Sequence, residues 1–285
     1  MPIYYVNGEF VPAEKAMIPV DDLAVIRGIG VFDLLRTHHG KPLFLKEHVD
    51  RLMASARQIN LDLPWSHEHI CQVARKTLAH NQMEEANIRI IVTGGSSSDF
   101  MNPQGKPRLL VLVAPLPKLP QWWYDQGIKV ITIHVERRLP GAKSIDYIPA
   151  AMALRQAHVQ GAVEAIYVDR EGRALEGTTC NLFAVINGRL VTPGSGILAG
   201  ITRQVVIDIS KNILPIDLRD LPRDELLAAQ EVFITGTSKG VVPVIQIDDA
   251  VIADGRPGPQ TRLIMAALEK YVDGSFGTGG EKAEG

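Results

Sequence analysis

The segment Leu175-Glu176-Gly177-Thr178-Thr179-Cys180-Asn181-Leu182-Phe183 places a carboxylate directly before a glycine turn and an apolar run. The apolar residues 182–186 predict a strand, so the chain carries Glu176 to the edge of a hydrophobic core. A carboxylate there costs free energy unless a cation or a hydrogen-bond donor pairs with it. The segment therefore indicates a paired carboxylate, and the alternative is a turn residue that follows the charged stretch 169–173.

Lys143 lies about thirty residues before Glu176, in the loop Gly141-Ala142-Lys143-Ser144. Lysine is mostly a surface residue, so Lys143 taken alone would be a solvated side chain. The order along the chain argues otherwise, because the loop lysine is followed by an expected helix over 149–160, a strand over 165–168 and then Glu176. A lysine amine also becomes a nucleophile readily, since desolvation or nearby cations lower its pKa.

Two further motifs complete the pattern, His48-Val49-Asp50-Arg51-Leu52 and Leu198-Ala199-Gly200-Ile201-Thr202-Arg203. With Lys143 and Glu176 they resemble the class IV aminotransferases, the fold-type-IV enzymes that depend on pyridoxal 5'-phosphate (PLP). That family includes branched-chain and D-amino-acid aminotransferases and aminodeoxychorismate lyase, and the resemblance extends from about Tyr4 to about Tyr271. It implies that Lys143 is catalytic and forms an imine with PLP, and that Glu176 keeps the pyridine nitrogen protonated.

The resemblance also implies a phosphate site. Arg51 would turn its guanidinium onto the phosphate, where the fork geometry suits the oxygens. The backbone of the Gly200-Ile201-Thr202 step would grip the same group, because free amides and the macrodipole at a helix start favour an anion. Without the resemblance, Arg51 is a solvent-facing helix residue and the glycine precedes a plain capped helix. The implied cofactor residues are Arg51, Lys143, Tyr147, Glu176, Leu198, Gly200, Ile201, Thr202 and Thr237.

Substrate contacts are expected from two arginines, Arg27 and Arg89. Arg89 lies in a β-rich run, where an unpaired charge would be costly, so an anionic partner such as a substrate carboxylate is expected. The alternatives are an ion pair from Arg89 to Asp33 or Asp99, and a surface or subunit-interface charge for Arg27. The implied substrate-binding residues are Arg27, Phe32, Arg89, Thr237 and Ser238.

The substrate class is where the motifs diverge. Branched-chain enzymes usually have tyrosine at the position of Arg27. The best-known D-amino-acid aminotransferases have tyrosine at that of Phe32, with an arginine and a histidine in the loop that here reads Ser-Ser-Ser-Asp-Phe-Met (96–101). An arginine pair at 27 and 89 resembles a less common group of D-amino-acid transaminases, whereas Arg89 alone also fits the branched-chain pattern.

We therefore expect a transaminase that acts on α-amino acids, of the D-amino-acid type, with 2-oxoglutarate or pyruvate as acceptor. The alternatives are a branched-chain L-amino-acid aminotransferase and a lyase of the aminodeoxychorismate type. The non-enzymatic alternative is a PLP-binding paralogue that has lost turnover, and the presence of Lys143 and Glu176 argues against it.

The composition excludes several other classes. The chain has 285 residues, 46 % of them hydrophobic and 22 % charged, as in an ordinary globular protein of about two domains. Its formal net charge of −2 gives no electrostatic reason to bind nucleic acid or an anionic membrane. The two cysteines, Cys71 and Cys180, offer neither a disulfide framework nor metal-ligand spacing, so no metal site is expected.

The expected setting is the cytoplasm. No apolar run is long enough to span a bilayer, and the N-terminus begins with an expected hairpin around Asn7-Gly8 in place of a leader. The partners that the resemblance implies are an amino acid, a 2-oxo acid and a second copy of the chain. A homodimer is implied because the family's equivalent of 27–32 approaches the neighbouring subunit's pocket.

The order of elements predicts an α+β fold, because strands and helices intermingle without regular alternation. Three prolines within 115–120 cannot occupy a central strand or a helix interior, so this segment predicts a linker. The expected domains are a smaller N-terminal α/β domain over 1–114 and a larger, β-rich, cofactor-binding domain over 121–273. The low-complexity segment 274–285 is expected to be disordered. Helices are expected at 45–59, 67–80, 149–160, 201–212 and 259–271.

Overall fold

The computed structural model describes residues 1–277, and these form two compact units. The first unit comprises residues 1–118 and 137–149, and the second comprises 119–136 and the described residues from 150 onward. The first change of unit falls inside the proline-rich segment 115–120. The segment 137–149, which contains Lys143, belongs to the first unit, although it lies within the predicted range 121–273.

The first unit is built on one antiparallel sheet in the order β2-β1-β6-β5-β3-β4. Its N-terminal hairpin turns at Asn7 and Gly8, with Val6 opposite Glu9, which confirms the expected hairpin. The strands are β1 (Ile3–Val6), β2 (Glu9–Pro12), β3 (Gly30–His38), β4 (Lys41–Pro42), β5 (Ala86–Thr93) and β6 (Arg108–Pro115). The helices are α1 (Leu23–Arg27), α2 (Leu45–Gln58) and α3 (His67–Asn81), with a 3-10 turn at Ala13–Lys15.

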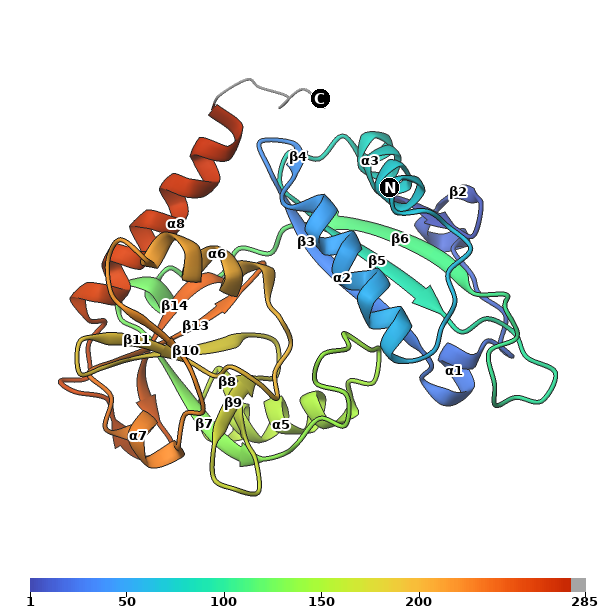
Figure 1. Cartoon of the computed structure of the whole chain (residues 1–285). Coiled ribbons are helices and arrows are strands. Elements are labelled where there is room, and N and C mark those ends of the chain that lie inside the picture. Colours follow the sequence, from blue (N-terminus) through green and yellow to red (C-terminus); the bar gives the residue numbers. More distant parts are fainter. Residues whose placement is uncertain (278–285) are drawn as a thin grey trace. The chain divides into compact units, whose positions relative to one another are not determined.

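Helices α2 and α3 cover one face of this sheet (Figure 1). Strand side chains alternate between the two faces. In β5, Ile88, Ile90 and Val92 are fully buried in one cluster with residues of both helices. The same cluster includes Val31 and Leu35 of β3. The residues between them in β5 and β3, among them Arg89 and Phe32, therefore lie on the opposite face.

The second unit contains a closed barrel of mixed strands. The ring runs β10-β13-β14-β7-β8-β9, and it closes because Glu176 of β9 pairs with Asn181 of β10. The strands are β7 (Ile128–His134), β8 (Glu164–Val168), β9 (Ala174–Gly177), β10 (Asn181–Ile186), β11 (Arg189–Thr192), β12 (Ile216–Leu218), β13 (Glu231–Gly236), β14 (Gly240–Ile247) and β15 (Ala250–Val251). The helices are α4 (Trp122–Asp125), α5 (Ile148–Val159), α6 (Ile201–Ser210), α7 (Arg223–Leu227) and α8 (Pro259–Gly277).

All six barrel strands contribute to a single apolar cluster, which therefore fills the barrel interior. In β10, Leu182 and Ala184 belong to this cluster, while Phe183 points the other way and stacks on Phe233 of β13 at 4.9 Å between ring centroids. Helix α6 contacts β13, and α8 contacts both β13 and β14 (Figure 1). Strands and helices thus intermingle in this unit, and the predicted α+β class is confirmed.

The expected C-terminal tail begins within a helix. Helix α8 extends to Gly277, so the predicted disorder from residue 274 is wrong for 274–277, and residues 278–285 lie outside the described part. Cys71 and Cys180 are both buried and free. Among the described residues, no helix combines the length and the apolar character needed to cross a bilayer.

Candidate active site

Lys143 lies in a loop that is anchored to a strand and a helix of the first unit. Its carbonyl accepts a hydrogen bond from the amide of Phe32 at 3.0 Å, and the amide of Ile145 donates to the carbonyl of Gly30 at 3.1 Å. Its own amide donates to Ser55 Oγ of α2 at 3.0 Å. The backbone at Lys143 is therefore held from both sides, although the segment is neither helix nor strand.

Three predicted site residues contact the ring of a fourth, Phe32. The Nζ atom of Lys143 lies 4.7 Å from the ring centroid, and the guanidinium carbon of Arg89 lies 5.0 Å from it. The ring of Tyr147 meets Phe32 edge-on, with centroids 5.3 Å apart. Because a cation over an aromatic face is attracted by the ring quadrupole, Phe32 is a contact surface for two positive groups.

Arg89 departs from the expectation in its burial. Its side chain is exposed, because its neighbours Ile88 and Ile90 take the helix-facing positions of β5. Arg89 is therefore not buried as expected, and its position in β5 does not require an anionic partner. The two alternative partners, Asp33 and Asp99, are held by other residues, so neither forms the ion pair considered for Arg89.

Arg27 is the exposed last residue of α1, and its guanidinium donates to the carbonyl of Ile26 at 3.0 Å. The helix is fixed at its other end by the buried Asp22, whose Oδ1 accepts from the amide of Ala24 at 2.8 Å. Asp22 Oδ2 also accepts from Arg108 at 2.8 Å. The five-residue helix is thus firmly placed, and it presents Arg27 to solvent in a single chain.

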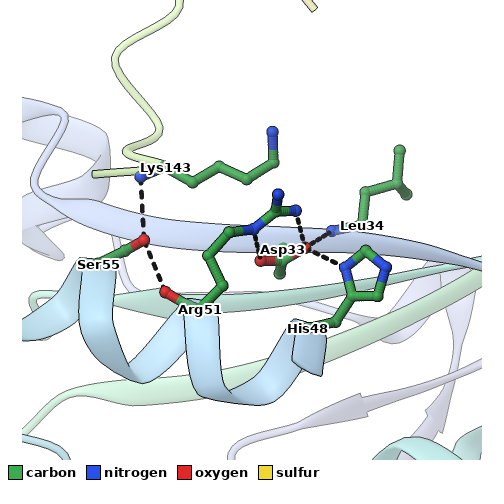
Figure 2. Close-up of polar contacts among 6 residues, drawn as sticks. All are labelled: Asp33, Leu34, His48, Arg51, Ser55 and Lys143. Atoms are coloured by element: carbon green, nitrogen blue, oxygen red, sulfur yellow. Dashed lines mark hydrogen bonds and ion pairs between the residues drawn. The ribbon is translucent and has the colours of Figure 1, made fainter. Parts of the chain in front are cut away.

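Asp33 organises the residues around Arg51 (Figure 2). It lies fully buried in β3, on the face that α2 covers. Its two oxygens accept hydrogen bonds from Arg51 Nε at 2.9 Å and Arg51 Nη2 at 2.8 Å. Oδ1 also lies 2.6 Å from His48 Nδ1. The alternative of a solvent-facing Arg51 is wrong, because its side chain is 12 % exposed and bound in a bidentate ion pair.

The charge state of this cluster follows from its contacts. Burial raises the pKa of Asp33, but the charges and hydrogen bonds of His48 and Arg51 outweigh burial and hold that pKa well below its usual range. Burial lowers the pKa of His48. Asp33 is therefore ionised, and its Oδ1 atom accepts a hydrogen bond from His48 Nδ1.

The role of Asp33 was not predicted from the sequence, where Asp33 was considered only as an alternative partner of Arg89. The signal was present: Asp33 stands between Val31 and Leu35 at a core-facing position of an apolar strand. A charge in that position requires partners, and a helix with His48 and Arg51 one turn apart can supply them. His134 and His158 are exposed at the ends of β7 and α5 and lie outside this cluster.

Glu176 is buried in β9 of the second unit, with 5 % of its surface exposed. Its Oε2 accepts a hydrogen bond from the amide of Leu198 at 3.0 Å, and Asn181 Nδ2 lies 3.4 Å from the same oxygen. Asn181 Nδ2 also donates to the carbonyl of Leu198 at 2.9 Å. Glu176 lies buried at the core edge, as the apolar strand after it predicted, and the alternative of a turn residue is wrong. Its pairing with a pyridine nitrogen stays a prediction.

The start of α6 lies beside Asn181. Gly200 is the N-cap residue, and no side chain caps the helix. A Cβ atom at Gly200 would overlap Asn181 Oδ1, so only glycine fits there. Thr235, opposite Asn181 in the sheet, has a buried hydroxyl without a hydrogen-bond partner in the described part of the chain. Uncapped amides and an orphaned hydroxyl suit an anionic or strongly hydrogen-bonding ligand.

Arg203 and Asn181 also lack a predicted role, although both stand within the quoted motifs. The guanidinium of Arg203 is buried, with Nε 3.2 Å from Thr192 Oγ1 and Nη2 2.9 Å from Pro193 O. Burial lowers its pKa, and the charge of Glu176 opposes that shift. Arg203 therefore places a positive charge near the Glu176 carboxylate.

Thr237 and Ser238 occupy the turn that joins β13 to β14, and both are half-buried. The strands pair as far as Gly236 and Gly240, so the turn between them is tight. The predicted site residues thus fall into two sets. Arg27, Phe32, Arg51, Arg89, Lys143 and Tyr147 belong to the first unit, and Glu176, Leu198, Gly200, Ile201, Thr202, Thr237 and Ser238 belong to the second.

Comparison with known proteins gives one consistent family. Residues 30–247 match the family described as amino-transferase class IV. A protein of Methanocaldococcus jannaschii named "Putative branched-chain-amino-acid aminotransferase" is 38 % identical over 280 residues, covering 94 % of this chain and 95 % of the relative. The D-alanine aminotransferase of Staphylococcus aureus strain N315 is 32 % identical over 276 residues, covering 94 % and 97 %.

Solved structures confirm the expected fold-type-IV architecture. The T.th. branched-chain amino acid aminotransferase, solved with pyridoxamine 5'-phosphate, superposes with a TM-score of 0.90 at 31 % identity, covering 96 % of this chain and 94 % of its own. The same enzyme in complex with N-(5'-phosphopyridoxyl)-L-glutamate superposes with a TM-score of 0.88 at the same identity and coverage.

Proposed function

The chain belongs to the class IV amino-transferase family, and we propose that it is a PLP-dependent transaminase that transfers the amino group of D-amino acids to a 2-oxo acid. 2-Oxoglutarate is the expected acceptor. The observation that carries the proposal is the buried Glu176, held by the amide of Leu198 and by Asn181 beside the uncapped start of α6. The bound groups in the two T.th. structures support the choice of cofactor.

The residues of this chain fit PLP on chemical grounds. When bound, PLP supplies the electron sink for the bond that breaks at the substrate α-carbon. Glu176, with the charge of Arg203 nearby, would hold the protonated pyridine nitrogen of PLP. Gly200, Ile201 and Thr202 offer backbone amides to the phosphate at the N-terminus of α6, together with the Thr237 hydroxyl and the Leu198 backbone.

Arg51 and Lys143 are the cofactor residues proposed in the first unit. Arg51 binds a phosphate oxygen while its ion pair to Asp33 fixes the plane of its guanidinium. Lys143 would hold the cofactor through its Nζ atom, and its amine would move the proton at the substrate α-carbon. Tyr147 lies against Phe32 and would line the cofactor pocket on the side of the PLP hydroxyl.

Substrate recognition is assigned to positive groups around Phe32. Arg89 binds a carboxylate of the dicarboxylic substrate, since it lies over the same ring as Lys143. Thr237 and Ser238 contact the substrate from the β13–β14 turn. Arg27 acts in a homodimer, in which the segment 27–32 completes the pocket of the second copy.

The test of the cofactor assignment is borohydride reduction of the purified protein followed by peptide mapping. The pyridoxyl group is expected on Lys143. A label on Lys239, Lys129 or another lysine would overturn the assignment of the catalytic residue.

A branched-chain L-amino-acid transaminase is the second candidate function. The name of the M. jannaschii relative favours it, whereas the S. aureus relatives and the arginine pair at 27 and 89 favour D-amino acids. A screen of D- and L-amino acids with 2-oxoglutarate separates the two. Fast turnover of L-leucine and L-isoleucine without reaction of D-alanine or D-glutamate would decide for the branched-chain enzyme, and elimination without amino transfer would indicate a lyase.

A further inference from the structure

One buried ion pair in the second unit has no role in the proposed reaction. Glu164, at the start of β8, is fully buried on the inner side of the barrel. Its Oε1 accepts hydrogen bonds from the amides of Ala165 at 3.0 Å and Thr178 at 3.2 Å, and from the Thr178 hydroxyl. Its Oε2 accepts from the Thr179 hydroxyl at 2.9 Å. The carboxylate thus holds both threonines of the β9–β10 turn.

Lys239 is the cation of the pair. It is the last residue of the β13–β14 turn, and its Nζ lies 2.7 Å from Glu164 Oε2 and 2.8 Å from Thr179 Oγ1. Its backbone carbonyl accepts a hydrogen bond from the Tyr124 hydroxyl at 2.9 Å. Lys239 is therefore fixed at both its side chain and its backbone, which leaves the turn little freedom.

These contacts join two turns that flank assigned site residues. The β9–β10 turn begins two residues after Glu176, and the β13–β14 turn contains Thr237 and Ser238. The β9–β10 turn has no spare room, because a Cβ atom at Gly177 would overlap Cys180 Sγ. A shift of Lys239 would therefore move Thr237 and Ser238 and be transmitted to the turn after Glu176.

Stability alone does not account for this arrangement. Removing two charges from water costs free energy that their attraction repays only with good geometry and further hydrogen bonds, and an apolar pair of similar volume is often as stable. The Glu164 carboxylate has those further bonds, and each has a defined direction. An ion pair with directed bonds fixes the relative position of two turns more narrowly than apolar side chains do.

We propose that Glu164 and Lys239 are positioning residues that set the β13–β14 turn so that Thr237 meets the cofactor phosphate. The inference rests on the proposed function, because it takes PLP as the ligand and Thr237 as a phosphate contact. It assigns the pair no contact with the reacting atoms.

The test compares two ligands of the full-length apoenzyme by tryptophan fluorescence titration. PLP carries the phosphate, and pyridoxal is the same ring without it. In Lys239→Met the affinity for PLP is expected to fall about tenfold or more, while the affinity for pyridoxal changes less than about twofold. Equal losses for both ligands, or no loss for either, would overturn the positioning role.

Three further variants keep the test decisive. Lys211→Met removes a lysine whose ion pair to Asp208 is exposed, and it should leave both affinities unchanged. Lys239→Arg retains a cation for Glu164 and should restore most of the PLP affinity. The double variant Glu164→Gln/Lys239→Met leaves no buried unpaired charge, so it decides the question if Lys239→Met does not fold, and wild-type PLP affinity in it would contradict the inference.

Failure of the inference and failure of the proposed function give different results. A wild-type protein that binds neither PLP nor pyridoxal would overturn the proposed function itself. A wild-type protein that binds PLP far more tightly than pyridoxal, with the same preference in Lys239→Met, would overturn only the positioning role.

Discussion

Asp33 in the first unit and Glu164 in the second are fully buried carboxylates with cationic partners, and the two partners differ in kind. In the first unit Asp33 binds the planar guanidinium of Arg51 and the imidazole of His48. In the second unit Glu164 binds the ammonium of Lys239 and two threonine hydroxyls. Burial alone would raise the pKa of both carboxyl groups. The charges and hydrogen bonds of their partners have the larger effect, so both pKa values are lowered.

The difference lies in what each carboxylate orients. A guanidinium has donors on several edges, so Asp33 can occupy one edge and leave the plane of Arg51 correctly turned for an anion. An ammonium has no such plane, and Lys239 is instead attached to Thr179 and to the turn that carries Thr237. Asp33 therefore orients a side chain, whereas Glu164 orients a segment of backbone.

The largest effect is expected outside both ion pairs, at the proposed catalytic amine. Lys143→Ala removes the group that moves the α-proton, so kcat should fall at least about a thousandfold. Steady-state kinetics with a D-amino acid and 2-oxoglutarate measure this. Lys46→Ala, an exposed lysine of α2, is the matched control, and an equal loss there would show that the effect is not specific to Lys143.

The orienting role of Asp33 is tested through cofactor retention. Arg51→Ala removes a charge-assisted contact worth about 1.5–3 kcal/mol, so PLP should bind roughly ten- to a hundredfold more weakly. Asp33→Asn keeps Arg51 but removes the carboxylate that fixes the orientation of its guanidinium. This variant should therefore also bind PLP more weakly than wild type. Dialysis followed by absorbance of retained PLP gives both values, and Arg57→Ala, an exposed arginine of α2, is the control. Full retention in Asp33→Asn would contradict the comparison.

The exposed arginines should affect the acceptor and leave the cofactor in place. If Arg89 binds a substrate carboxylate, Arg89→Ala should lower kcat/KM for 2-oxoglutarate roughly ten- to a hundredfold, the equivalent of about 1.5–3 kcal/mol. Arg27→Ala should act in the same direction in the dimer. Pyruvate, which has a single carboxylate, is the comparison substrate, and parallel losses with both acceptors would remove the dicarboxylate assignment.

The smallest effect concerns acid stability. The pKa of Asp33 is depressed in the folded protein, so its stabilising contribution is complete above the unfolded pKa of about 3.9 and declines as pH falls toward the folded value. Between pH 7 and pH 3 the free energy of unfolding should fall about 1 kcal/mol less in Asp33→Asn than in wild type. Urea unfolding at several pH values measures this, and identical pH slopes would contradict an ionised Asp33.

The sequence by itself was enough to identify the family and most of its elements. The expected helix over 45–59 is α2, and the expected strand over 182–186 lies in β10, because both have strong apolar periodicity or a continuous apolar run. The helix over 201–212 likewise corresponds to α6, which begins at Ile201 after the glycine that the motif contains. These helices and strands are determined by the pattern of apolar residues within each segment.

Only the tertiary structure decided which charges are paired and which are exposed. Arg89 and Arg51 are both arginines within regular elements, yet β-strand alternation exposes one and α2 turns the other onto Asp33. Asp33 and Arg51 are 18 positions apart and Glu164 and Lys239 are 75 apart, so neither pair is visible as a motif. Pairing across such separations depends on which faces of strands and helices pack together. Tertiary packing decides this, and the local sequence does not.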